Sequence, residues 1–190
     1  MKKYLFFLIV IIIIGFPFII YKSEFFSKGQ NDFTKEPKVS MQSSLKIESN
    51  AFLDGELIPP KYTCDGENII PPLLISNVPE NAKSLVLIVD DPDAPMGIWN
   101  HLLLWNIDPS IYRIDEGKLP ENAQIGKNDF GKNEYGGPCP PSGTHRYFFK
   151  LFALDTTLDL DINSGRKELD KKMEGHIITS ASLMGRYSKR

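Results

Sequence analysis

Residues 84–95 of the chain read SLVLIVDDPDAP, a run that decides the class of fold. Its first half is continuously apolar rather than alternating, which is typical of a strand covered on both faces. Pro92 and Pro95 lack N–H donors and restrict the residues before them, so the ladder of a sheet must end here. The sequence therefore predicts a buried strand that delivers several carboxylates to one edge of a sheet. Ala94-Pro95 is a candidate for a cis bond, because cis-proline is usually found in tight turns.

Other short apolar runs, separated by turn signals, extend this pattern from Leu45 onward. Residues 45–49 alternate with period two, as a half-buried strand should. Residues 102–107, 147–154 and 177–184 are similar to the first run. Because strands dominate, we expect a mainly β fold, and a two-layer β-sandwich is the simplest way to bury so many apolar faces.

One segment before the last of these runs has the pattern of a helix. Ser164 can cap it, Glu168 falls in its first turns, and Gly175 can stop it. Leu169 and Met173 lie four residues apart and would share one face. The sandwich is therefore expected to carry one or two short helices.

The first segment differs from the rest of the chain. Lys2 and Lys3 precede an apolar run from Tyr4 to Tyr21, close to the ~17–25 residues that span a bilayer. No small-residue cleavage motif follows it, which favours an uncleaved transmembrane signal anchor over residues 1–22. The positive-inside rule then places the rest of the chain on the extracytoplasmic side. A secreted or periplasmic domain, released by signal cleavage, is the alternative.

Residues 23–44 are polar and show no period, so they read as a tether. Residues 45–190 then form the domain. The whole chain has 190 residues, 42% of them hydrophobic, and a formal net charge of -2. These values fit one globular domain and give no electrostatic reason to expect a nucleic acid partner.

Residues 135–147 read YGGPCPPSGTHRY and form a second distinctive block. It contains His145, while His101 follows the first block, so two of the three histidines lie beside stiff Pro/Gly backbone. Rigid loops that present imidazoles and backbone N–H groups hold a small anion at low entropic cost. Strand alternation sends His145 and Tyr147 to one face and Arg146 to the other. We expect Arg146 to form a salt bridge with an aspartate of the first block.

Other chemistries find less support in these residues. An EF-hand loop counted from Asp91 needs Gly and Glu where Met96 and Leu102 stand. No Gly-x-Ser-x-Gly elbow for nucleophilic catalysis is present. Asp91, His101 and His145 could supply a zinc or iron site, although no His-x-x-x-His or Cys-x-x-Cys spacing supports one.

The two cysteines, Cys64 and Cys139, each lie in a Gly/Pro-bounded loop. In a domain outside the cytoplasm they could form one disulfide, and two unpaired buried thiols are the alternative. Cys139 stands between two prolines and at no helix N-terminus, so an activated thiolate is not expected.

At these blocks the chain resembles the phosphatidylethanolamine-binding protein family, specifically its bacterial Raf kinase inhibitor-like branch. The resemblance covers residues 45–190 and rests on several motifs together. The main ones are DPDAP at 91–95, residues 99–106 with His101, and GPCPP at 137–141 leading to HRY at 145–147; YTCDG at 62–66, PPL at 71–73 and EGHI at 174–177 support them.

The resemblance implies a β-sandwich with a small anion-binding cavity and no cofactor. By the family pattern Asp91, His101, Pro141, His145 and Tyr147 would line the cavity, with Pro95 shaping its rim. Donors on the two histidines and on backbone N–H groups near Gly137 would hold the anion. The complete set of ligand-binding residues expected is Asp91, Asp93, Pro95, His101, Gly137, Pro138, Pro141, His145 and Tyr147.

These residues support three functional hypotheses. The first is a non-enzymatic module that binds a phosphate- or carboxylate-bearing ligand, such as a lipid head group or a phosphorylated side chain. The second is a protein inhibitor of an extracytoplasmic protease or other enzyme, which would use the cavity rim as its docking surface. The third is a metal-dependent hydrolase built on Asp91, His101 and His145.

Overall fold

The computed structural model of this chain describes residues 44–189. The predicted anchor at residues 1–22 and all but the last residue of the predicted tether lie outside this range. Within the described residues, no helix has the length and apolar character needed to cross a membrane.

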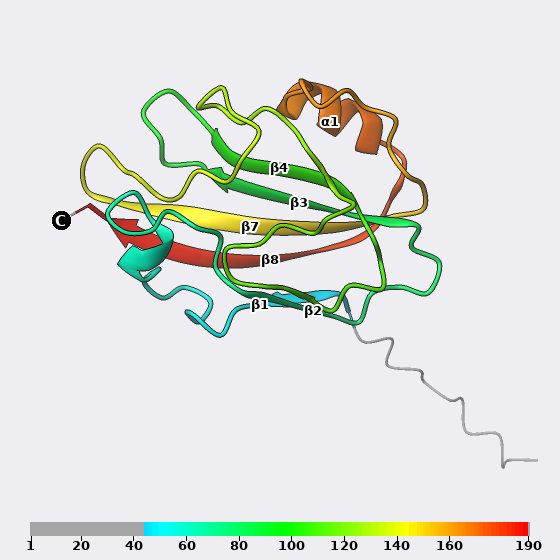
Figure 1. Cartoon of the computed structure of the whole chain (residues 1–190), viewed down its shortest axis with the longest axis horizontal. Coiled ribbons are helices and arrows are strands. Elements are labelled where there is room, and N and C mark those ends of the chain that lie inside the picture. The colour runs from blue at the N-terminus through cyan, green and yellow to red at the C-terminus, as the bar shows by residue number, and fades with distance from the viewer. Residues whose placement is uncertain (1–43, 190) are drawn as a thin grey trace, which may run out of the picture. The chain divides into compact units, whose positions relative to one another are not determined.

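Two antiparallel sheets form the body of residues 44–189 (Figure 1). The smaller sheet has the order β1-β2-β5, and the larger one has the order β6-β4-β3-β7-β8. The bounds are β1 Lys46–Glu48, β2 Leu73–Ser76, β3 Ser84–Asp91, β4 Trp99–Ile107, β5 Arg113–Ile114, β6 Gln124–Ile125, β7 Thr144–Leu154 and β8 Ile177–Ser188. The predicted mainly β sandwich is thus the observed architecture.

Strand β3 lies at the centre of the larger sheet, and all eight of its residues are buried. Leu85, Leu87 and Val89 pack in the core between the two sheets. Val86 and Ile88 pack on the opposite face, against helix α1 (Arg166–Met173). The prediction of a strand covered on both faces is confirmed, because one layer lies on each side of it.

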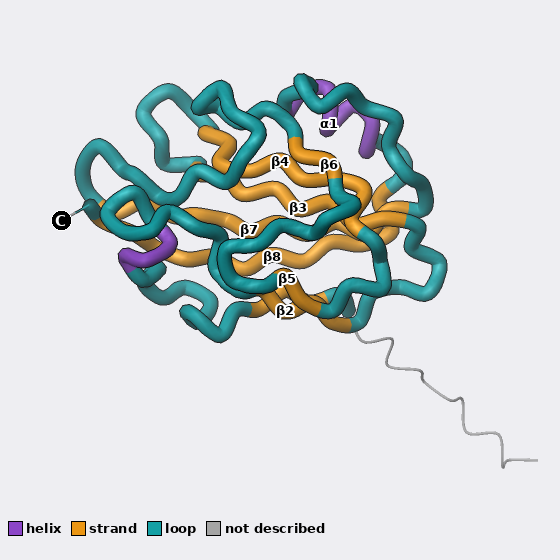
Figure 2. Tube along the Cα trace, viewed as in Figure 1, coloured by secondary structure: helices purple, strands orange, loops and turns teal. Residues whose placement is uncertain are grey.

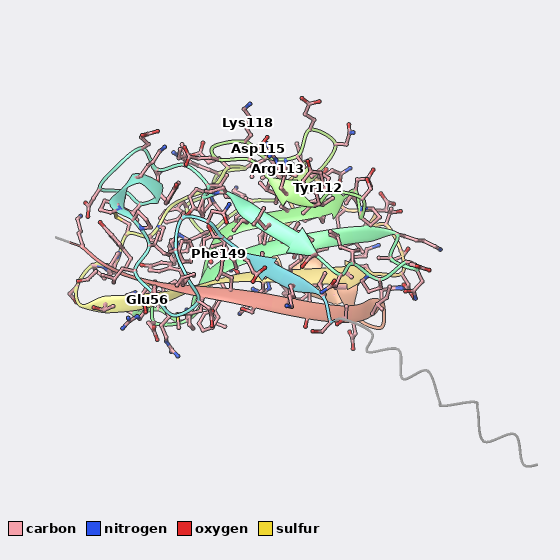
Figure 3. All side chains as sticks on the ribbon, turned by 90° about the horizontal axis from the view of Figure 1, so that it is seen from below. Glu56, Tyr112, Arg113, Asp115, Lys118 and Phe149 are labelled. Atoms are coloured by element: carbon pink, nitrogen blue, oxygen red, sulfur yellow. A yellow bond between two sulfur atoms is a disulfide. The ribbon has the colours of Figure 1, made fainter. Side chains whose placement is uncertain are left out.

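Figure 3 labels Phe149, which lies in the layer where β7 meets the smaller sheet. Its ring contacts that of Phe52 at a centroid distance of 5.8 Å. Phe149 is fully buried, whereas Tyr112, beside β5, is 69% exposed. The core therefore sits between the sheets, and the outer surface of β5 faces solvent.

Helix α1 differs from its prediction at one end. Its N-cap is Gly165 rather than Ser164, and the Gly165 N–H donates to the Glu168 carboxylate at 3.1 Å. The Ser164 carbonyl instead accepts a hydrogen bond from Lys127, which ties the helix entrance to a neighbouring loop. Gly175 follows the helix with a φ of 79°, as a helix stop should. A single 3₁₀ turn, η1 (Pro60–Tyr62), is the second short helix in the described part.

The expected cis bond at Ala94-Pro95 is wrong, since every described peptide bond is trans. The Gly97 N–H donates to the Ala94 carbonyl at 3.0 Å, which closes a four-residue turn. Pro95 is the second residue of that turn, where the fixed φ of a trans proline is favoured. The chain therefore reverses here without isomerising the bond.

Several loops gather at one end of the described domain, where β7 begins and β8 ends (Figure 2). The loop after β3, the loop before β7 and the segment around η1 gather at this end, on the left in Figure 1. The first block ends in the loop after β3 and the second begins in the loop before β7, so the fold brings them to one place.

Candidate functional site

A hollow of about 330 Å³ opens at this loop-rich end. Four of the expected ligand-binding residues lie in its wall: Asp91, Pro95, His101 and Pro141. The other residues that line it are Ala94, Met96, Trp99, Phe130 and Cys139. The two blocks therefore do meet around one cavity, and its surface is largely apolar.

Asp91 and His145 form a buried pair behind the wall. His145 Nδ1 lies 2.7 Å from Asp91 Oδ2, and both side chains are less than 10% exposed. The other carboxylate oxygen of Asp91 accepts the N–H of Asp93 at 2.8 Å. An ionised carboxylate only accepts hydrogen bonds, so His145 must donate from Nδ1.

Asp93 has a structural partner instead of a place in the hollow. Its carboxylate accepts from the backbone N–H, Nε and Nη2 of Arg146, at 2.6 to 2.9 Å. These hydrogen bonds lower the pKa of Asp93 to about 2. The predicted salt bridge from Arg146 is confirmed, and it anchors the loop after β3 to the start of β7.

An irregularity in β4 directs His101 toward the hollow. Val89 pairs with Leu102 and Asp90 pairs with Asn100, so His101 is an extra residue between two ladder positions. Asn100 and Asp90 face α1, where both accept from Arg166. The extra residue places His101 beside Leu102 on the inter-sheet side, which strict alternation would not do. Bulges of this kind are common where a side chain must be re-aimed.

A hydrogen bond and two aromatic contacts hold the His101 ring in place. Its Nδ1 lies 2.6 Å from the carbonyl oxygen of Gly136, and the Gly136 N–H donates back to the His101 carbonyl at 3.0 Å. The rings of Tyr147 and Phe130 each meet it edge-on at a centroid distance of 5.3 Å. Burial lowers the pKa of His101, and the Gly136 carbonyl only partly opposes this.

The backbone N–H groups of Gly136 and Gly137 already have partners within the protein. The Gly137 N–H donates to the side-chain oxygen of Asn68 at 2.8 Å. The Gly136 N–H is already bonded to His101. Pro138 has no N–H, and its carbonyl accepts from Cys64 at 3.1 Å. The Gly137 N–H and the Pro138 carbonyl connect two loops, and the Gly136 N–H connects its loop to β4.

A disulfide between Cys64 and Cys139 joins the same two loops. The two sulfur-bearing residues are both exposed, and Cys139 also lines the hollow. Close packing supports the bridge, since a Cβ on Gly137 would lie 2.5 Å from the Tyr62 carbonyl oxygen and from Asn68. We call this contact between residues 62–68 and 135–139 the loop clasp.

A second hollow of about 310 Å³ lies beside the first and shares Phe130 and Cys139 with it. Gly137 lies here rather than in the first hollow. Its other wall residues are mostly polar: Cys64, Asn68, Asn128, Lys132, Glu134 and Gly136. The two hollows differ in character, the first apolar and the second polar.

Tyr147 lies behind the first hollow and is fully buried. Its hydroxyl has no hydrogen-bond partner among residues 44–189. Burial raises the pKa of Tyr147, and the nearby charge of Asp91 raises it further. His145 and Tyr147 do share one face of β7, as alternation predicts, with Arg146 on the other.

Sequence reasoning missed Phe130, which contributes to both hollows. It lies in a loop that carries no motif, between Asp129 and Gly131. Its ring also contacts Trp99 edge-on at 5.5 Å. Only the tertiary structure places this aromatic side chain at the mouth of the cavity, and no signal in the sequence could have found it.

In the described part of the chain, no group of three or more His, Cys, Asp or Glu side chains is arranged to hold a metal ion. The suggested zinc or iron site at Asp91, His101 and His145 therefore has no matching geometry.

Comparison with known proteins identifies relatives over this same part of the chain. A family model described as phosphatidylethanolamine-binding protein matches residues 48–188. A UPF0098 protein from Methanothermobacter thermautotrophicus is 48% identical over 150 residues, which cover 76% of this chain and 99% of the relative. A UPF0098 protein from Pyrococcus horikoshii is 50% identical over 157 residues, covering 77% of this chain and 78% of the relative.

Two crystal structures share the fold. A phosphatidylethanolamine-binding protein homologue from Chlamydia trachomatis is 43% identical, with a TM-score of 0.75, and covers 77% of this chain and 99% of its own. The Escherichia coli protein YbcL, described as a member of the mammalian family, is 32% identical with a TM-score of 0.73. That match covers 78% of this chain and 100% of YbcL.

Proposed function

Because this chain belongs to the phosphatidylethanolamine-binding protein family, in the branch of its bacterial and archaeal relatives, we propose that it binds a small oxyanion-bearing ligand without transforming it. The observation that carries this proposal is the single hollow in which Asp91, His101 and Pro141 come together from distant segments. A ligand pocket is typically an apolar concavity with a few convergent polar groups, which is what this hollow is.

The rim of the hollow favours a ligand with an apolar part next to its anionic group. Met96 is 90% exposed and Phe130 is 44% exposed, although both line the cavity. Apolar surface left open beside a polar site is typical of binding surfaces. A phosphate ester attached to a hydrocarbon or aromatic group, such as a lipid head group, suits this combination.

The wall of the hollow supports binding rather than covalent chemistry. None of its nine residues carries a hydroxyl or a free thiol, since Cys139 is in a disulfide. Ser, Thr and Cys nucleophiles act next to a base, and the wall offers none of these groups in free form. We therefore propose no enzymatic activity.

Calorimetric titration of the full-length chain with phosphoethanolamine tests this function. His101→Gln keeps an amide N–H that can reach the Gly136 carbonyl, but it removes the imidazole from the hollow. We expect it to weaken binding at least about tenfold, which corresponds to about 1.4 kcal/mol.

The matched control is His176→Gln, because His176 is an exposed histidine paired with Asp155 at 2.8 Å and lies outside the hollow. It should bind like the parent chain. Equal affinity for all three proteins, or no binding by the parent chain, would refute the proposed function.

Protein inhibition remains the alternative function, and the exposed rim favours it. Ile98 is 58% exposed and, with Met96, forms an apolar edge beside the hollow. If the protein is an inhibitor, a pull-down from membrane extract should recover a stoichiometric enzyme. Met96→Glu should abolish that recovery while leaving phosphoethanolamine binding in place.

We also propose that the domain lies on the extracytoplasmic side of a membrane, held by the apolar segment at residues 4–21. The Cys64–Cys139 disulfide supports an oxidising compartment, because such bridges persist outside the cytosol. Protease added to intact cells should remove the domain, and a protected domain would contradict this location.

A further inference from the structure

An oxyanion needs hydrogen-bond donors or positive charge, and the hollow offers few of either. None of its lining residues is Lys or Arg, and its titratable side chains are Asp91 and His101. Pro95 and Pro141 supply no N–H groups. The Gly136 and Gly137 N–H groups are bonded elsewhere in the loop clasp and to His101. The Asp91 carboxylate adds negative charge to the wall.

The hydrogen bonding of His101 determines which of its ring atoms is available. A carbonyl oxygen only accepts, so the 2.6 Å contact with Gly136 requires the proton to be on Nδ1. In the neutral ring, Nε2 then carries a lone pair. The His101 ring lines the hollow, and its printed side-chain hydrogen bond is the one from Nδ1. The neutral site therefore offers an acceptor where an anion needs a donor.

We propose that the hollow takes up an oxyanion together with one proton, which is carried on Nε2 of His101. The inference rests on the proposed function and specifies the ionic form of the bound complex. Protonation turns this acceptor into a charge-assisted donor and supplies positive charge to a wall that contains no Lys or Arg. The bound state is an oxyanion beside an imidazolium.

The groups around His101 are compatible with a charged ring. Asp91 at the end of β3 and Asp129 in the loop after β6 both favour the protonated form. Tyr147 on β7 and Phe130 present uncharged rings. His145, a second basic group near the ring, is engaged with Asp91, and Lys132 lines the adjoining hollow. Burial lowers the pKa of His101 in the empty site, and a bound anion opposes that effect.

The coupling makes affinity depend on pH in a defined direction. At a pH above the pKa of His101 in the empty site, each binding event must draw one proton from solution. Affinity should then fall about tenfold for each added pH unit. The oxyanion would therefore bind at acidic pH and dissociate at neutral or basic pH.

Methyl sulfate is the probe because it stays a monoanion throughout this pH range. Any proton taken up on binding is therefore taken up by the protein. The full-length chain, kept in non-ionic detergent, is titrated calorimetrically at about pH 8, well above the ordinary histidine pKa of about 6.5. Two buffers with different ionisation enthalpies report the number of protons taken up. We expect about one proton per bound anion, and the same value for His176→Gln.

Ring-labelled histidine NMR identifies the residue that receives the proton. We expect the His101 signals to move to imidazolium values on saturation, and those of His145 and His176 to stay.

Binding with no proton uptake and a constant Kd would overturn the inference and leave the proposed function standing. Protonation of His145 instead, or binding of methyl phosphate but not of methyl sulfate, would also overturn it. Failure of both anions to bind at any pH would remove the proposed function as well.

Discussion

Two adjacent carboxylates, Asp90 and Asp91, have different partners because a strand alternates its side chains. Asp90 faces α1 and is fully buried, with Lys150 Nζ at 2.7 Å and Arg166 Nη1 at 3.0 Å. Asp91 faces the inter-sheet core and pairs with His145. The sequence DD at the end of β3 therefore serves two purposes, one in packing the helix and one at the hollow.

The protonation of His101 has a measurable effect on stability. Burial lowers its pKa in the folded protein, so below about pH 6.5 the unfolded chain binds a proton that the empty folded site resists. The stabilising contribution is present above that pH and is lost as the pH falls through the folded pKa. Each unit of lowering corresponds to about 1.4 kcal/mol.

We therefore expect the Tm of the unliganded chain to fall by a few degrees from pH 7 to about pH 5. His101→Gln should flatten this decline, since glutamine does not titrate, and His176→Gln should not. Thermal unfolding in a pH series measures it. A decline as steep in His101→Gln as in the parent chain would show that other groups cause it.

Among the structural elements, the loop clasp controls where the second block lies. The Tyr135 hydroxyl donates to the Tyr62 carbonyl at 3.2 Å, and Gly137 packs directly on the backbone of residues 62–63. A side chain at Gly137 has no room, because its Cβ would lie 2.9 Å from the Thr63 Cα. Moving this contact would displace Pro141 and the start of β7 from the hollow.

Gly137→Ala tests this role. We expect it to lower the free energy of unfolding by about 1–3 kcal/mol, as overpacking commonly does, and to weaken anion binding. Urea unfolding and calorimetry measure the two effects. The control is Gly165→Ala, where a Cβ would meet only the Glu168 carboxylate at 3.5 Å. If the two variants were equally stable and bound equally well, the clasp would not position the site.

At the level of the whole domain, the disulfide links two segments 75 residues apart in sequence. Closing a loop of this length restricts the unfolded chain, which stabilises the native state by about 4 kcal/mol in the chain-entropy model. The loop clasp retains its hydrogen bonds without the bridge, so the fold itself should survive reduction.

The double variant Cys64→Ser with Cys139→Ser should therefore stay folded but lose about 2–4 kcal/mol of unfolding free energy. Reduction of the parent chain with dithiothreitol should give the same value. Urea titrations with and without reductant measure both. A variant as stable as the oxidised parent would contradict a closed bridge in the native protein.

Local patterns predicted the elements well where the signal lies in neighbouring residues. The continuous run at β3, the alternation at β1 and the Leu169–Met173 spacing of α1 are all confirmed. Two local predictions, the N-cap of α1 and the isomer of Ala94-Pro95, were wrong. The N-cap moved to Gly165 because the Ser164 carbonyl bonds to a distant loop, and Ala94-Pro95 stayed trans because a turn could use that geometry.

Side-chain period and backbone stiffness are properties of consecutive residues, so the chain alone determined its strands, its buried centre and the two Pro/Gly blocks. The chain alone did not determine the hollow. His101 reaches it through a bulge defined by pairing with β3, Phe130 arrives from a loop without a motif, and the Gly137 N–H is taken by Asn68. Each of these depends on the register between segments far apart in sequence, and only the folded structure decides that register.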